Sequence, residues 1–156
     1  ARYSSQRHIF RRTTMITDQE IRDRTLIIDV VDRYARSIDM KDYDRLETCF
    51  TPNCEVIYGG AKALENPAAV TEFCSGVLSQ YTSTQHLLGN YEIAIADDTA
   101  TASTYMCATH IFPRDEKHEV YIVGGTYDDE LVRNGDEWLI SKRSLTVLWS
   151  EARETV

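Results

Sequence analysis

The chain has 156 residues, of which 42% are apolar and 27% charged, and its formal net charge is −8 at pH 7. This length is typical of one domain with a sizeable core, and the acidic balance excludes the basic face that a nucleic-acid partner requires. No apolar run approaches the ~18 residues of a membrane-spanning helix, so we expect no membrane partner.

Residues 1–14 (ARYSSQRHIFRRTT) differ in composition from the rest of the chain, with four arginines and no acidic residue. They show no apolar periodicity and lack the continuous apolar stretch of a secretory signal. We interpret them as an N-terminal arm, a mis-assigned start or residues added for expression. The folded domain is expected over residues 15–156.

Helical signals occupy the first half of this domain. The sequence TDQE at residues 17–20 has the form of a capping box, and helical spacing behind it predicts a helix over residues 18–38. A short helix is predicted over residues 42–50 and a third over residues 65–81, where Asn66-Pro67 suits a helix start. The apolar stripe of the first helix consists of Ile21, Ile28, Val31, Ala35 and Ile38, with Ile27 and Tyr34 on an adjoining stripe.

A strand-like run covers residues 54–60, and after residue 82 the apolar period changes to alternation. Four long strands are predicted in two hairpins: 83–98 with 99–112, turning at Asp97-Asp98, and 119–135 with 136–150, turning at Asn134-Gly135.

Helices followed by long strands are typical of an α+β fold. We predict a cone, in which a curved antiparallel sheet wraps around the long N-terminal helix and two shorter helices. Gly124-Gly125 lies inside a predicted strand and indicates a bulge or a sharp bend. A sheet that bends over a helix encloses an interior where a small molecule can bind.

The four cysteines, Cys49, Cys54, Cys74 and Cys107, form no C-x-x-C pair and have no histidine cluster beside them, so we predict no metal site. We interpret them as buried, reduced thiols, which are typical of a cytoplasmic protein. The chain contains neither G-x-G-x-x-G nor a P-loop, and we expect no cofactor.

Proton transfer by Asp, His and Tyr side chains is the remaining catalytic option, because no nucleophile motif such as G-x-S-x-G is present. His86 shares a strand face with Thr84 and Leu88, and it is either a hydrogen-bonded core residue or a base. Asp39 lies at the end of the first helix, where a carboxylate opposes the macrodipole. It is either the cap of the next helix or the partner of a histidine.

Three further residues also have two interpretations. Tyr34 can pack in the core or present its hydroxyl to a ligand. His110 shares a strand face with Met106 and Ala108, but its place near a strand end favours surface exposure. Arg133 precedes a turn, where it can pair with an acidic residue.

Three segments resemble the SnoaL-like branch of the nuclear-transport-factor-two/ketosteroid-isomerase superfamily: RYARSIDMKDYDRLETCFTPNCEV, TQHLLGN and GGTYDDELVRNGDEWLISKRSL. Within that branch the chain is similar to scytalone dehydratase, bile-acid 7α-dehydratase and hexachlorocyclohexane dehydrochlorinase. The resemblance implies that Asp39 and His86 form a dyad inside the cone and that Tyr34 faces the same pocket.

The same resemblance implies three substrate-binding residues. His110 is similar to a second pocket histidine of scytalone dehydratase, and Tyr127 falls where that enzyme has an asparagine. Arg133 matches an arginine of the dehydrochlorinase. Family members assemble as trimers or dimers, so we expect a homo-oligomer, with Trp149 and its apolar neighbours on the outer face of the sheet as the contact.

The expected function is a cofactor-independent lyase that dehydrates a hydrophobic cyclic or steroid-like small molecule. His86 would act as the base, Asp39 would orient it, and Tyr34 would act as an electrophilic or acid partner. Two alternatives stay open: an isomerase or polyketide-type cyclase with the same dyad, and a non-catalytic subunit resembling the β subunits of ring-hydroxylating dioxygenases.

Overall fold

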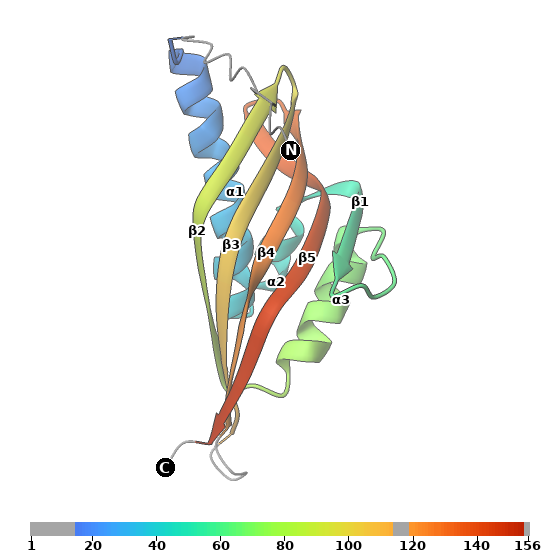
Figure 1. Cartoon of the computed structure of the whole chain (residues 1–156). Helices are drawn as coiled ribbons and strands as arrows, with labels where there is room; N and C mark the ends of the chain where they lie inside the picture. The colour runs from blue at the N-terminus through green and yellow to red at the C-terminus, as the bar shows by residue number, and fades with distance from the viewer. Residues whose placement is uncertain (1–14, 114–118, 155–156) are drawn as a thin grey trace, which may run out of the picture.

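A computed structural model describes residues 15–113 and 119–154, so the interpretation of residues 1–14 lies outside the described residues. The elements in chain order are α1 (Asp18–Met40), α2 (Tyr43–Glu47), β1 (Phe50–Tyr58), α3 (Pro67–Leu78), β2 (Ser83–Ala96), β3 (Thr99–Ile111), β4 (Glu119–Asn134) and β5 (Glu137–Glu154). The long strands lie side by side and curve over α1, while α3 lies beside β1 (Figure 1). The predicted α+β class is confirmed.

Helix α1 begins with the predicted cap. The Thr17 side chain accepts a hydrogen bond from the Glu20 backbone N–H at 3.1 Å, which satisfies a free amide of the first turn. The helix continues to Met40 and is capped by Lys41 in the left-handed conformation, with φ 54°. It is therefore longer than predicted, and Asp39 lies within its last turn.

The buried face of α1 differs from the predicted stripe. Ile27 and Val30 are fully buried, whereas Ile21 is 55% exposed and Ile28 is only half-buried. The prediction was wrong for Ile21 because, in the second turn, the face toward the sheet is taken by Asp23, which is buried in a polar network. Periodicity alone does not reveal a buried carboxylate among apolar residues.

The five strands form one sheet in the order β1-β5-β4-β3-β2. Strands β2 to β5 pair antiparallel, as expected, but β1 pairs parallel with β5, so the sheet is mixed. The turn at Asp97-Asp98 is confirmed, whereas the second turn is Gly135-Asp136, one residue later than predicted. Gly135 has φ 63°, which a glycine adopts without steric cost.

The predicted irregularity at Gly124-Gly125 is confirmed as a shift in the pairing of β4 with β5. A Cβ atom at Gly124 would lie 2.1 Å from the Trp149 side chain, and one at Gly125 would lie 2.3 Å from the Thr146 carbonyl oxygen. Both glycines therefore allow β5 to approach β4 closely at this shift, which helps the sheet to curve.

The core fills the space between the inner face of the sheet and the helices. Its largest fully buried side chains are Trp138, Arg143, Tyr34, Tyr127, Ile27, Leu46, Leu131, Ile140, Val30, Val31, Val56 and Val70. These residues include a charged arginine and two tyrosines, so the interior contains polar side chains as well as apolar ones.

Candidate active site

A cavity of about 260 Å³ opens between α3 and the inner face of the sheet. Its wall is mainly apolar, and every element except α2 contributes to it. Polar or aromatic side chains are contributed by Tyr34, Tyr58, Phe73, Cys74, Tyr81, His86, His110, Tyr121 and Tyr127. An apolar concavity with a few polar groups is the usual form of a small-molecule site.

Asp39 and His86 are in direct contact beside this cavity. The His86 Nδ1–H donates to Asp39 Oδ1 at 2.7 Å, and the His86 backbone N–H donates to Asp39 Oδ2 at 2.8 Å. The exposed fractions of the two side chains are only 6% for His86 and 14% for Asp39. Helix α1 and strand β2, far apart in sequence, therefore bring the Asp39 and His86 side chains into contact.

The carboxylate also sets the tautomer of the imidazole. An ionised carboxylate only accepts hydrogen bonds, so His86 Nδ1 carries the proton and Nε2 keeps its lone pair. Burial by itself would raise the pKa of Asp39, but the hydrogen bonds from His86 and Thr84 outweigh it and hold that pKa below its usual value. Asp39 is therefore ionised at neutral pH, and the arrangement can accept a proton at Nε2.

Asp39 does not cap the next helix, which was the alternative interpretation of this residue. Asp42 fills that position, because its Oδ1 accepts from the Arg45 backbone N–H at 3.2 Å. The last turn of α1 contains no basic residue, so Asp39 opposes the macrodipole without local compensation. Its stabilising partners come from β2 instead.

His110 lies inside the cavity and not at the surface. Its ring is 5.8 Å from that of His86 and 4.7 Å from that of Tyr81, measured between ring centroids. Its Nδ1–H donates to the Tyr121 carbonyl oxygen at 3.2 Å, which directs Nε2 away from that carbonyl. Burial lowers the pKa of His110, so its neutral form is favoured.

Tyr34 reaches the cavity as half of a tyrosine pair. Its hydroxyl is 2.6 Å from that of Tyr58, and the Tyr58 hydroxyl is 3.7 Å from Cys74 Sγ. Burial raises the pKa of both tyrosines well above the usual value, so both stay protonated and can donate. Tyr58 was missed because its strand is an ordinary apolar run, and its partner lies on a helix.

Arg143 was also missed, although its side chain is fully buried behind the tyrosine pair. It donates two hydrogen bonds to Asp129, at 2.7 and 2.6 Å, and its Cζ lies 4.0 Å from the Tyr34 ring centroid and 4.4 Å from that of Tyr127. A pairing shift after Ile140 changes the alternation of β5 and turns Arg143 inward. Strict alternation from Ile140 would place Arg143 on the outer face.

Tyr127 lies in the cavity wall, with its ring 5.6 Å from that of Tyr34. Burial raises its pKa to about 12, so its hydroxyl is protonated at neutral pH.

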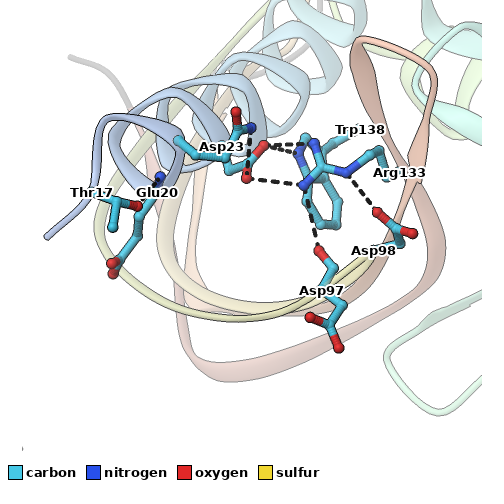
Figure 2. A network of polar contacts seen from close by, with 8 residues as sticks. Thr17, Glu20, Asp23, Asp97, Asp98, Arg133 and Trp138 are labelled. Atoms are coloured by element: carbon cyan, nitrogen blue, oxygen red, sulfur yellow. Dashed lines mark hydrogen bonds and ion pairs between the residues drawn. The ribbon is translucent and has the colours of Figure 1, made fainter. Parts of the chain in front are cut away.

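Arg133 does not line this cavity, which corrects the expectation that it is one of the substrate-binding residues. It donates to both carboxylate oxygens of Asp23, at 2.7 and 2.9 Å, and to Asp98 at 2.8 Å (Figure 2). Trp138 donates to the same Asp23 carboxylate at 3.1 Å. Arg133 lies near the end of β4, several residues beyond Tyr127, so it reaches the start of α1 instead of the cavity.

A larger hollow of about 540 Å³ is lined mainly by charged and hydroxyl side chains of the sheet, including Glu92, Asp128, Glu130 and Lys142. It contains no His, Tyr or Cys side chain, so we place the candidate active site in the smaller cavity. Within residues 15–113 and 119–154, no group of three His, Cys, Asp or Glu side chains is arranged to hold a metal ion. In the same ranges, no helix has the length and apolarity needed to cross a bilayer.

Comparison with known proteins gives one family and several similar folds. Residues 19–144 match the SnoaL-like domain. The uncharacterized protein Rv2910c of Mycobacterium tuberculosis is 29% identical over 131 residues, which cover 83% of this chain and 88% of that protein.

Two solved structures share the fold. A candidate scytalone dehydratase from Novosphingobium aromaticivorans has a TM-score of 0.79 at 20% identity, covering 89% of this chain and 93% of its own. A hexachlorocyclohexane dehydrochlorinase, LinA-type3 from Novosphingobium barchaimii, has a TM-score of 0.78 at 14% identity, covering 87% and 93%.

Proposed function

The chain belongs to the SnoaL-like domain family, and from this premise we propose that it is a cofactor-independent lyase that removes water from a small, hydrophobic cyclic molecule. The observation that carries the proposal is the contact between Asp39 and His86, which leaves His86 Nε2 available at an apolar cavity. Dehydratase and dehydrochlorinase names among the proteins of similar fold support an elimination.

In the proposed reaction, His86 Nε2 takes a proton from carbon, and the electron pair of that C–H bond forms the new double bond. The C–O bond breaks, and the leaving hydroxide takes back the proton from His86 to depart as water. Asp39 stabilises the imidazolium that exists between these events. One such acid–base group contributes about 10²–10⁴-fold to a rate.

The tyrosine pair is the proposed electrophile. One hydroxyl of the pair donates to the other, so one O–H remains to donate to an oxygen of the substrate. Such a donor stabilises the negative charge that develops on a carbonyl oxygen when the neighbouring carbon loses its proton. His110 Nε2 is proposed to accept a hydrogen bond from a hydroxyl group of the substrate.

The cavity also limits the substrate. Its volume of about 260 Å³ lies below the ~300–1,000 Å³ usual for sites that bind drug-sized ligands. A molecule with one or two rings therefore fits better than a full steroid skeleton. We propose a cytoplasmic location, which the free thiols of all four cysteines support.

The test uses a panel of small cyclic β-hydroxy ketones and measures loss of water by mass spectrometry. We expect His86→Gln and Asp39→Asn to reduce turnover by at least about 10²-fold. Gln85→Ala is the matched control, because Gln85 is exposed and adjacent to His86, on the opposite face of β2. A product with a moved double bond and no loss of water would instead indicate the isomerase alternative, and wild-type turnover by His86→Gln would exclude the mechanism.

A further inference from the structure

A second residue of β2 contacts the Asp39 carboxylate. Thr84 and His86 are two residues apart, so their side chains project from the same face of the strand. The Thr84 hydroxyl donates to Asp39 Oδ1 at 3.0 Å, and this is the oxygen that also accepts from His86 Nδ1. With the His86 backbone N–H on Oδ2, the carboxylate receives three hydrogen bonds from a single short stretch of strand.

The surroundings of Thr84 indicate a fixed hydroxyl. The residue is buried, with 9% of its surface exposed, and a β-branched side chain has few χ1 rotamers available. Asp39 lies at the end of a helix whose macrodipole opposes its charge. The Thr84 hydroxyl is therefore a donor held in place at a carboxylate that no basic residue in the last turn of its own helix stabilises.

We propose that Thr84 is a positioning residue of the Asp39–His86 dyad, whose hydroxyl keeps the carboxylate turned so that Oδ1 accepts from His86 Nδ1. Without this hydroxyl the carboxylate would be held only by the two hydrogen bonds from His86 and could turn more easily. It would then hold Nδ1–H less firmly, and the imidazole would populate the tautomer with its proton on Nε2 to a greater extent. That tautomer cannot accept a proton at the cavity. This inference rests on the proposed function only for the statement that Nε2 is the base.

The groups around His86 make its tautomer sensitive to this hydroxyl. Asp39 faces it from α1 and His110 from β3, while Tyr81 and Tyr121 pack against His110. Among these groups only Asp39 hydrogen-bonds to the His86 ring within the described part of the chain. The Thr84 hydroxyl also contributes to the low pKa of Asp39, after the larger effects of burial and of His86.

The experiment is ¹⁵N NMR of the His86 ring in the full chain, for the wild type, Thr84→Val and Thr84→Ser. We expect the wild type to show a protonated Nδ1 and an unprotonated Nε2. In Thr84→Val the two shifts should move toward each other as the second tautomer is populated, and Thr84→Ser should restore most of the wild-type pattern. Once a substrate is known, kcat of Thr84→Val should fall about tenfold with KM little changed.

Thr104→Val is the matched control. Thr104 is fully buried on the same face of the sheet, and its hydroxyl has no hydrogen-bond partner among the described residues. If valine at position 84 disturbs the strand, Thr84→Ala provides the same comparison without the added methyl group. Unchanged ¹⁵N shifts in a folded Thr84 variant would overturn the positioning role, whereas changed shifts combined with a fully active His86→Gln protein would overturn only the proposed function.

Discussion

At the scale of single residues, the candidate active site is built from pairs whose members come from different elements. Asp39 of α1 meets His86 of β2, and Tyr34 of α1 meets Tyr58 of β1. In the first pair the carboxylate fixes the tautomer of the imidazole, and in the second pair one hydroxyl donates to the other. The buried Arg143 guanidinium stacks on the Tyr34 ring and, by its charge, opposes the increase in the pKa of that tyrosine that burial causes.

The tyrosine pair should act as a unit. We expect Tyr34→Phe and Tyr58→Phe each to reduce kcat by about 10–10³-fold, because either change leaves the remaining hydroxyl without its partner. The double variant should lose little more than the worse single variant, since residues that act together are not additive. A double-mutant cycle on kcat measures this coupling, and additive losses would show that the hydroxyls act independently.

At the scale of elements, α1 connects two polar centres. Its first turns hold Asp23 in the network with Arg133 and Trp138, and its last turn holds Asp39 beside His86. The two carboxylates are sixteen residues apart, or roughly 24 Å along a helix. The network at Asp23 therefore anchors the beginning of the helix that carries the dyad carboxylate at its end.

This anchor predicts a pH-dependent stability. The hydrogen bonds from Arg133 lower the pKa of Asp23 far below its usual value, although burial opposes them. The unfolded chain then binds a proton at Asp23 before the folded chain does, so this stabilisation is complete above about pH 4 and is lost as the pH falls further. Asp23→Asn should lower the urea midpoint most at neutral pH, and the difference from wild type should shrink at pH 3.

Asp29→Asn is the control for this measurement, because Asp29 is exposed on the same helix. It should change the midpoint little at either pH. A difference between wild type and Asp23→Asn that stays constant from pH 7 to pH 3 would contradict the ion-pair explanation.

At the scale of the whole molecule, the outer face of the sheet is apolar where four strands align. Leu87, Cys107, Gly124 and Trp149 are paired across β2, β3, β4 and β5. Leu87 and Trp149 are 62% and 50% exposed, and the missing side chain at Gly124 leaves space for the indole. None of the four residues is charged, although the chain carries a net charge of −8.

We propose that copies of this chain associate through that row as a dimer or trimer, because like-charged molecules can approach there with the least repulsion. Trp149→Lys should shift the protein to monomer at micromolar concentration in multi-angle light scattering. Ile21→Lys, which adds the same charge at an exposed apolar residue of α1, should leave the assembly intact. A wild-type monomer, or equal effects of both variants, would refute the proposal.

The amino-acid sequence by itself determined the features that depend on neighbouring residues. Thr17 and Asn66 cap their helices because each side chain accepts a hydrogen bond from a backbone N–H only three residues later in the chain. Such a contact does not depend on the tertiary structure. The change of apolar period located the strands, and Gly124-Gly125 located one irregularity. The meeting of Asp39 and His86 followed from family resemblance, since no local pattern connects residues so far apart.

Only the tertiary structure decided which residues share the cavity. Arg143 turns inward because a pairing shift reverses the alternation of β5. Neither the composition nor the apolar period of the segment predicts this shift. Arg133 lies at the other end of the molecule because β4 is long and carries it past the cavity. Tyr58 and Thr84 gain their partners from α1, so their roles depend on how a helix packs on a curved sheet, which local propensity does not encode.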